Sequence, residues 1–252
     1  MNELQSGERV ALVTGASGGM GLAISRALAA QGFRVALNDL HARDAERGTE
    51  TISKLGYFGL AVPGDVTVAS VADSIIRIVE TQLGRLDVLV NNAGVLKATR
   101  AEAISDEEWD FVVNGNLRSA FYCCRAAIPA LRRSGRGGII NISSSAGKSV
   151  STIGGVHYTA AKAGVLGLTR HLARELAPDN IRVNAVCPGL IDTPMVRTTI
   201  PDARVDAYAA SFPARRLGLP SEVADLVAFL ASDRATYITG ASCDINGGDL
   251  TI

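Results

Sequence analysis

Short apolar runs rich in β-branched residues alternate with longer stretches of helical periodicity along the whole chain. The runs lack strict polar–apolar alternation, which is typical of parallel strands that are covered on both faces. Because strand and helix alternate, the pattern predicts an α/β fold, in which a doubly wound parallel sheet of about seven strands carries helices on both faces. The expected strands are residues 9–15, 33–40, 57–62, 86–94, 138–144, 181–189 and 241–247, and the expected helices are 19–31, 41–55, 68–83, 106–133, 157–177 and 221–231.

The chain has 252 residues without a linker, repeat or low-complexity tract that would divide it, so we expect one domain over residues 1–252. Lys plus Arg and Asp plus Glu each number 25, and this balance argues against a nucleic-acid or membrane partner held by charge. No apolar run approaches the ~18 residues of a membrane span, and the N-terminal segment lacks the apolar core of a signal peptide. We therefore expect a cytoplasmic protein. Its four cysteines lack the spacing of metal ligands, so we expect no metal.

The first expected strand leads directly into a glycine-rich segment, TGASGGMG at residues 14–21, and a helix follows. Glycines let the backbone approach a pyrophosphate closely, and the start of a helix offers it free N–H groups. The G-x3-G-x-G spacing differs from the usual dinucleotide fingerprint, so the segment alone also fits a plain tight loop. Within a full strand–helix series it predicts a Rossmann-type dinucleotide site made by Gly15, Ser17, Gly18, Gly19, Met20 and Gly21.

An acidic residue, Asp39, ends the second expected strand. A carboxylate at this position can accept hydrogen bonds from both ribose hydroxyls of an adenosine, and it repels a 2′-phosphate. Residues 14–25 contain no Arg or Lys that could bind such a phosphate. We therefore predict a preference for NAD(H), with NADP(H) less favoured and with Asp39 and Leu40 beside the adenosine. The alternative is that Asp39 only caps the helix that follows.

Residues 190–219 interrupt the pattern with a long segment that prolines punctuate, beyond the end of an expected strand. Ligands of open α/β sheets bind beyond the carboxyl ends of the strands, so this segment is a candidate substrate-binding flap. The alternative is a structural excursion that packs against an edge of the sheet. The segment contains three arginines, Arg197, Arg204 and Arg215. Two interpretations stay open for them: they contact an acyl-carrier or phosphate group, or they are solvated.

Tyr158 and Lys162 lie four residues apart in the helix expected at 157–177, and so on one face of that helix. An ammonium group beside a phenol favours the phenolate, so the pair predicts a tyrosine of lowered pKa that exchanges a proton with a substrate oxygen. Taken alone, the pair also fits a surface Tyr and Lys on an amphipathic helix. His41, His157 and His171 stand apart from any such pattern, and we assign them no role.

Five motifs occur in the order that is found in the short-chain dehydrogenase/reductases: TGASGGMG, NNAG at 91–94, INISS at 140–144, Tyr158-x3-Lys162 and CPG at 187–189. The chain resembles this family over essentially its whole length. The resemblance implies that Tyr158 is the general acid/base and that Lys162 lowers its pKa and holds the nicotinamide ribose. It also implies that Asn116, in the stretch NGNLRS, orders a water in a proton relay. The alternative for Asn116 is an ordinary polar residue inside a helix.

A serine at the end of the INISS strand would hydrogen-bond the substrate oxygen, but the run Ser143-Ser144-Ser145 leaves its identity open. The family's usual spacing from serine to tyrosine selects Ser145, whereas alignment on the strand selects Ser144. A strand fixes the face on which a side chain lies, while a loop tolerates an insertion. We therefore predict Ser144.

The resemblance implies further cofactor contacts along the chain, as well as an assembly. Members of the family commonly form homotetramers, so a homotetramer is implied here and a dimer is left open. Contacts to adenine, adenosine and nicotinamide would come from Asp65, Val66, Asn92, Ala93, Gly94, Pro188, Gly189, Ile191 and Thr193, together with Tyr158 and Lys162.

The implied reaction is NAD(H)-dependent hydride transfer that interconverts a secondary alcohol and a ketone, both small molecules whose identity the sequence leaves open. One alternative is a 3-oxoacyl-carrier-protein reductase, which in this family typically uses NADPH and which Asp39 disfavours. Another is a catalytically silent NAD-binding protein. An enoyl reductase of the family usually separates Tyr and Lys by more than three residues, and an extended-branch epimerase needs a larger C-terminal domain.

Overall fold

The computed structural model describes residues 8–251, in which seven strands form one parallel sheet of order β3-β2-β1-β4-β5-β6-β7. The order reverses between β1 and β4, which is the topological switch point where ligands bind in doubly wound sheets. The sheet thus confirms the predicted fold class, with strands that end somewhat earlier than expected. The strands are β1 Arg9–Val13, β2 Phe33–Leu37, β3 Gly59–Ala61, β4 Val88–Asn91, β5 Gly137–Ile142, β6 Ile181–Pro188 and β7 Ser242–Ile245.

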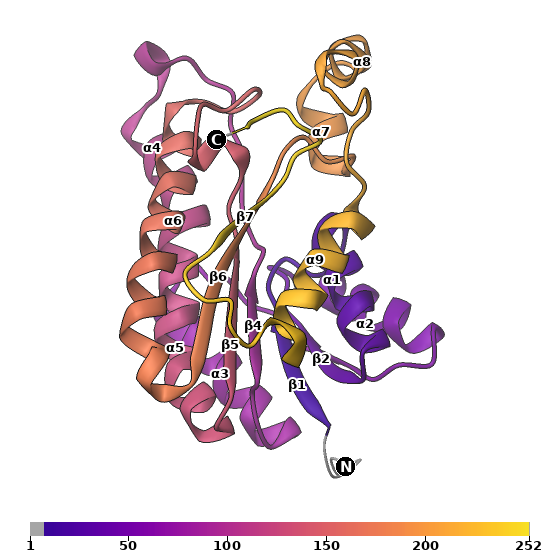
Figure 1. The fold of residues 1–252 in the computed structure, drawn as a ribbon, viewed down its shortest axis with the longest axis vertical. Helices are drawn as coiled ribbons and strands as arrows, with labels where there is room; N and C mark the ends of the chain where they lie inside the picture. Colours follow the sequence, from indigo (N-terminus) through magenta and orange to yellow (C-terminus); the bar gives the residue numbers. More distant parts are fainter. Residues whose placement is uncertain (1–7, 252) are drawn as a thin grey trace.

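Helices cover both faces of the sheet (Figure 1). On β1, Leu12 packs into a core shared with α3 and α5, whereas the next residue, Val13, packs into a core shared with α1 and α9. Successive residues of a strand point to opposite faces, so the central strands carry apolar side chains toward both. The covering helices are α1 Gly19–Ala30, α2 Ala42–Lys54 and α9 Pro220–Ala231 on one face, and α3 Ala69–Leu83, α5 Ser119–Ser134 and α6 Val156–Leu176 on the other.

The stretch predicted as one helix at 106–133 contains a change of helical pitch. It begins as α4, Asp106–Val113, passes through a π-helical turn at Asn114–Arg118 and continues as α5. Such π-helical turns are rare and occur frequently at functional sites. Asn116 lies in this turn, which therefore sets the direction of a predicted catalytic side chain.

The segment at 190–219 forms two helices that the sequence pattern did not predict, α7 Pro194–Thr199 and α8 Asp202–Ser211. They lie beyond the carboxyl ends of the strands (Figure 1). The prolines do not break these helices, because Pro194 occupies the first helical position of α7, where a missing N–H costs nothing. The segment has a small apolar core of its own, formed by Val196, Ile200, Val205, Phe212 and Leu217.

Short 3₁₀ turns complete the described elements, at Ala101–Ala103, Ser145–Gly147, Ala177–Asp179 and Asp233–Ala235. Over residues 8–251, none of the helices combines the length and the apolar character needed to cross a membrane.

Candidate active site

The glycine-rich segment forms the turn between β1 and α1, as predicted. Gly21 contacts the carbonyl oxygen of Gly15 so closely that a β-carbon has no room there. The side chain of Asn92 holds the turn from β4, because its Nδ2 donates to Thr14 O at 2.9 Å and to Gly15 O at 3.0 Å. The turn is therefore a tightly packed cradle whose N–H groups lie at the start of a helix, an arrangement suited to a pyrophosphate.

The Asp39 carboxylate is hydrogen-bonded by two backbone N–H groups of the protein. Its Oδ2 accepts from Ser17 N at 3.0 Å, and its Oδ1 accepts from Leu40 N at 2.8 Å. The carboxylate thus holds the glycine-rich turn against the end of β2. The sequence argument had considered Asp39 only as a ribose acceptor or a helix cap.

A cavity beside the turn collects most of the predicted adenosine contacts. Asp65 lies there, although its Oδ1 also accepts from Thr67 N and Thr67 Oγ1, at 2.8 and 2.7 Å. Phe111 and Asn114, which the sequence analysis missed, line the same cavity from α4 and the π-helical turn. The predicted residues in its lining are Gly15, Asp39, Leu40, Asp65, Val66, Ala93 and Gly94.

A second cavity extends over the turn toward the flap segment, and it contains an unpredicted cation. Arg47 of α2 lines it beside the glycine-rich turn. Close packing of α2 explains this position, because Gly48 would place a β-carbon 3.3 Å from the Ser17 α-carbon. The sequence analysis did not predict this cation. The predicted residues that line this cavity are Gly15, Ser17, Gly18, Gly19, Met20, Gly21, Asn92, Ala93, Gly94 and Thr193.

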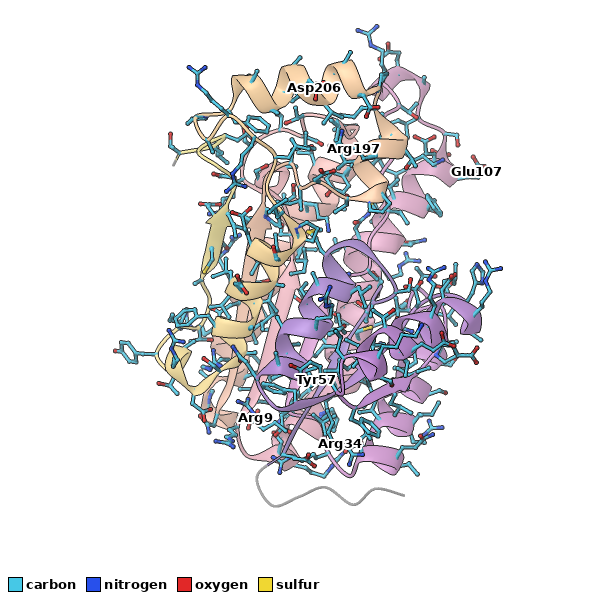
Figure 2. All side chains as sticks on the ribbon, turned by 90° about the vertical axis from the view of Figure 1, so that its right-hand side faces the viewer. Arg9, Arg34, Tyr57, Glu107, Arg197 and Asp206 are labelled. Carbon is cyan, nitrogen blue, oxygen red and sulfur yellow. The ribbon has the colours of Figure 1, made fainter. Side chains whose placement is uncertain are left out.

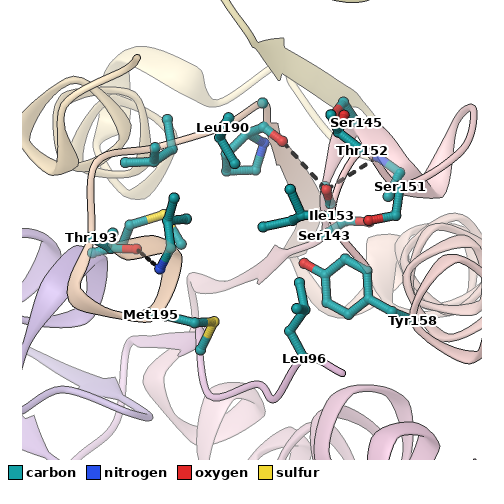
Figure 3. Close-up of a pocket in the computed structure, with 17 residues that line it drawn as sticks. Leu96, Ser143, Ser145, Ser151, Thr152, Ile153, Tyr158, Leu190, Thr193 and Met195 are labelled. Atoms are coloured by element: carbon teal, nitrogen blue, oxygen red, sulfur yellow. Dashed lines mark hydrogen bonds between the residues drawn. The ribbon is translucent and has the colours of Figure 1, made fainter. Parts of the chain in front are cut away.

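Tyr158 lies at the base of a third cavity, with its hydroxyl pointing inward (Figure 3). Lys162 follows one turn later on α6, and its Nζ lies 5.6 Å from the centre of the Tyr158 ring. The Lys162 side chain is buried, and its Nζ donates to Ile142 O at 2.9 Å. The predicted pair therefore shares one helical face at the carboxyl end of β5.

The pKa values of this pair are set mainly by burial. Burial raises the pKa of Tyr158 to about 12, and a hydrogen bond with Ser144 opposes that rise. Burial lowers the pKa of Lys162 to about 8. For the chain's own groups the shift runs opposite to the predicted direction, because desolvation of the buried phenol is the largest cause. Tyr158 therefore carries its proton at neutral pH.

The three consecutive serines have different positions. Ser143 is buried, and its hydroxyl donates to Lys162 O at 2.8 Å. Ser144 and Ser145 both line the Tyr158 cavity, and of the two it is Ser144 whose side chain opposes the rise in the Tyr158 pKa. Ser144 Oγ donates to Pro188 O at 3.5 Å and accepts from Ala146 N at 3.1 Å. This geometry favours Ser144 over Ser145, and its catalytic role stays a prediction.

Asn116 is buried, and its amide group is fixed. Its Nδ2 donates to Val95 O at 2.7 Å and to Val112 O at 2.8 Å. Its Oδ1 is buried without a hydrogen-bond partner within the described residues. A β-carbon on Gly94 would lie 2.6 Å from this oxygen and 3.5 Å from Lys162 Nζ, so the glycine leaves the space between the two groups open.

Apolar side chains form the walls of the Tyr158 cavity. The flap segment contributes Leu190, Met195 and Val196, while Leu96 and Ile153 come from loops on the opposite side (Figure 3). The predicted nicotinamide contacts Pro188, Gly189, Ile191 and Thr193 also line it. Thr193 Oγ1 additionally caps α7, where it accepts from Val196 N at 3.4 Å.

Two of the flap arginines bind other residues of the flap. Arg197 binds the carboxylates of Asp192 and Asp202, and Arg204 donates to Tyr208 Oη at 2.7 Å. Figure 2 shows Arg197 at the end of the molecule formed by α7 and α8. These contacts make the solvated alternative the better interpretation for both arginines.

The arrangement fits a nicotinamide dinucleotide. The glycine-rich cradle suits a pyrophosphate, and the unpartnered Asn116 Oδ1 faces the space left by Gly94 beside Lys162. The first cavity could hold the adenosine, and the second, which runs from Arg47 over the cradle to Thr193, could hold the phosphates and the nicotinamide ribose. In contrast, residues 8–251 bring together no group of three or more His, Cys, Asp or Glu side chains that could hold a metal ion.

Comparison with known proteins extends this result. Residues 15–249 match the family described as enoyl-(acyl carrier protein) reductase. The 3-oxoacyl-[acyl-carrier-protein] reductase FabG of Staphylococcus aureus (strain Mu50) is 42% identical over 239 residues, which cover 94% of this chain and 96% of that protein. FabG of Escherichia coli (strain K12) is 41% identical over 241 residues, 95% of this chain and 96% of that protein. The crystal structure of gox2181 is 37% identical with a TM-score of 0.92, covering 98% of this chain and 96% of that one.

The parallel sheet, the glycine-rich first turn and the Tyr–Lys pair define a dinucleotide-dependent oxidoreductase that acts on a CH–OH or keto group. With relatives of this identity and coverage, the chain belongs to the short-chain dehydrogenase/reductase family.

The comparisons also correct the cofactor prediction. The FabG relatives are NADPH-dependent, so the predicted preference for NAD(H) is wrong. In the structure the Asp39 carboxylate accepts hydrogen bonds from Ser17 N and Leu40 N, so an acidic residue at this position does not by itself indicate a ribose ligand. An acidic residue at the end of the second strand serves here to hold the turn. The sequence argument also missed Arg47, which brings a positive charge to the second cavity, over the glycine-rich turn.

Proposed function

We propose that the protein is an NADPH-dependent ketoreductase that reduces 3-oxoacyl thioesters to 3-hydroxyacyl thioesters. The observation that carries this proposal is the position of Tyr158, whose hydroxyl points into an apolar cavity that Ser144 also lines. A protonated phenol in this position can supply the proton that the substrate oxygen gains in reduction. The 42% identity to a named 3-oxoacyl-[acyl-carrier-protein] reductase supports the substrate class.

Different residues of the chain would carry out different parts of the reduction. The Ser144 and Tyr158 side chains both line the cavity in which a keto oxygen would lie, where their hydroxyls would orient it and stabilise the negative charge that develops there. Tyr158 Oη then gives its proton to that oxygen. The hydride comes from NADPH, whose nicotinamide ring carries it. Lys162 and the free Oδ1 of Asn116 supply a polar path behind Tyr158 through which its proton can be replaced.

The flap at residues 190–219 would bind the acyl part of the substrate. Leu190, Met195 and Val196 face Leu96 and Ile153 across the cavity, and this apolar lining suits an acyl chain. The α7–α8 unit has its own small core, so it can move as a unit over the site. Residues 1–252 would then act as one domain that contains its flap.

The 2′-phosphate of NADPH requires a cation, and we assign this role to Arg47. Its guanidinium lies in the groove beside the glycine-rich turn, where its partner is the Asp44 carboxylate at 3.2 Å. The side chain is largely exposed, so exchanging this carboxylate for a phosphate costs little. Arginine also binds phosphate well because its planar fork donates two parallel hydrogen bonds.

A homotetramer is the assembly that we propose. Large apolar side chains remain exposed on α4 and α5, among them Trp109, Phe111 and Phe121. A contiguous exposed apolar face is typical of protein–protein contacts. Light scattering would test the proposal, and a monomer at micromolar concentration would refute it.

The decisive experiment measures NADPH oxidation with an acetoacetyl thioester, presented on acyl carrier protein and separately on coenzyme A. We expect turnover of the keto substrate, formation of the 3-hydroxyacyl thioester and little activity with NADH. Absence of turnover with both thioesters would refute the proposed substrate class.

An enoyl reductase is the second candidate, because the matching family carries that description. A crotonyl thioester in the same assay separates the two activities. The three-residue gap between Tyr158 and Lys162 leads us to expect no reduction of the crotonyl double bond.

A further inference from the structure

His157, which the sequence analysis left without a role, is completely buried directly before Tyr158. It lies in the first turn of α6, where backbone N–H groups lack partners within the helix. A buried imidazole needs partners for both ring nitrogens, since unsatisfied polar groups are costly in a protein interior. The two partners of His157 connect the catalytic tyrosine to a different helix.

One ring nitrogen contacts the backbone of Tyr158 itself. The Tyr158 N–H donates to His157 Nδ1 at 2.9 Å, and it also reaches Gly155 O at 3.1 Å. Because Nδ1 accepts a hydrogen bond, it carries no proton. The ring proton is therefore on Nε2, which donates to Glu108 Oε1 at 3.0 Å.

Glu108 extends this connection to α4 and to the loop before it. Hydrogen bonds with the Thr99 side chain and with His157 lower the pKa of Glu108, so it remains an ionised acceptor. The loop is also joined directly to the start of α6, because Gly155 N donates to Lys97 O at 2.8 Å. A β-carbon on Gly155 would lie 2.6 Å from Thr99 O, so the two segments pack without a gap.

The same loop carries Leu96, a wall of the Tyr158 cavity. Hydrogen bonds through Glu108 and His157 thus connect this wall of the cavity to the backbone of Tyr158, the residue that carries the catalytic hydroxyl. Packing alone would hold the helices together. The hydrogen bonds add a fixed orientation of the first turn of α6, on which the direction of the Tyr158 side chain depends.

We propose that His157 and Glu108 are a positioning pair, which holds the Tyr158 hydroxyl in register with Ser144 and with the cavity wall for proton transfer. The pair acts through geometry and touches neither substrate nor cofactor. The inference goes beyond the proposed function, because it applies to whichever ketone the enzyme reduces.

The test compares Glu108→Leu, which removes the acceptor, with Glu108→Gln, which keeps an acceptor oxygen without the charge. Glu107→Leu and Glu107→Gln are the matched controls, because Glu107 is exposed on the same helix and projects outward (Figure 2). Steady-state kinetics with the ketone would give kcat and both KM values for each variant. A misplacement of about 1 Å can lower a rate on the order of a hundredfold.

We expect Glu108→Leu to lower kcat by on the order of ten- to a hundredfold with both KM values unchanged, and Glu108→Gln to restore most of the rate. An unchanged kcat in Glu108→Leu would overturn the proposal. So would a Glu108→Gln variant as slow as Glu108→Leu, since the acceptor oxygen would then be insufficient.

Nitrogen NMR of the unmodified protein provides a second readout that needs no substrate and no variant. We expect the His157 ring to carry its proton on Nε2 near pH 7, with Nδ1 unprotonated. A ring protonated at Nδ1 would exclude the hydrogen bond from Tyr158 N–H and overturn the proposal, even if Glu108→Leu failed to fold.

Discussion

Replacing Gly94 by alanine tests the geometry at the centre of the site. The new β-carbon would lie 2.6 Å from Asn116 Oδ1 and 3.5 Å from Lys162 Nζ. A relaxed contact needs roughly 0.9 Å more than that, because non-bonded atoms attract best at about 3.5 Å and repel strongly at shorter range. The Asn116 side chain must therefore move, or the β4 loop must.

The cost follows from what holds Asn116 in place. Its two hydrogen bonds, to Val95 O at 2.7 Å and to Val112 O at 2.8 Å, would both lengthen toward the limit of a useful bond. Each contributes about 1 kcal/mol to stability, so weakening both predicts a loss of about 1–2 kcal/mol in the free energy of unfolding. Strain from overpacking adds about 1 kcal/mol or more.

Urea denaturation measures this loss, and Gly138→Ala is the matched control. Gly138 lies in β5, and a β-carbon there would meet Val88 Cγ2 at 3.7 Å, an ordinary contact. We expect Gly94→Ala to unfold at clearly lower urea and to lose most of its kcat, while Gly138→Ala changes little. If Gly94→Ala were as stable and as active as the control, the fixed position of Asn116 beside Lys162 would be refuted.

Three further predictions concern the neighbouring groups. Ser144→Ala should lower kcat by on the order of a hundredfold, because the Ser144 side chain interacts with Tyr158. Ser145→Ala should keep a kcat near the wild-type value. Equal kcat values for the two variants in steady-state kinetics would contradict this prediction. The contribution of Lys162 to the free energy of unfolding should rise with pH between about 8 and the ordinary lysine pKa, because the unfolded chain keeps a proton on Lys162 that the folded chain has released. The cysteines, whose pKa values are raised by burial, contribute a fall above about pH 9, so the Lys162 contribution is measured as the difference between wild type and Lys162→Met in urea titrations at several pH values. A difference that does not change with pH would contradict the assignment. Arg47→Leu should raise the KM for NADPH about tenfold and leave kcat unchanged, because one phosphate contact is lost. Arg43→Leu is its control, because Arg43 lies on the same helix, α2, but does not line this cavity. An equal change in both variants would exclude Arg47 as the 2′-phosphate ligand.

The sequence predicted the sheet well because burial on both faces leaves a local pattern in each strand. It did not predict α7 and α8, since Pro194 and Pro201 look like breaks until one knows that a helix begins at or beside each of them. The π-helical turn around Asn116 has no periodic signal of its own. Its extra residue per turn becomes visible only when the helix is built.

The site was predictable wherever its residues are close in sequence, as Tyr158 and Lys162 are. The direction of the Tyr158 pKa shift could not be predicted in this way. The four-residue spacing indicates a nearby ammonium, but it does not indicate the burial of the phenol, which raises the pKa. His157 was assigned no role, since its partner Glu108 lies 49 positions earlier in the chain. The hydrogen bond from Ser17 N to Asp39 could not be predicted either, because it depends on how the glycine-rich turn packs against the end of β2.

The central claim is that the Tyr158 hydroxyl gives its proton to the substrate oxygen. Tyr158→Phe removes only that hydroxyl, so NADPH should still bind, as fluorescence titration would show. In a single assay of acetoacetyl thioester reduction, we expect this variant to lose nearly all turnover. A rate above about a tenth of the wild-type value would contradict the account, because general acid catalysis is worth on the order of a hundredfold or more.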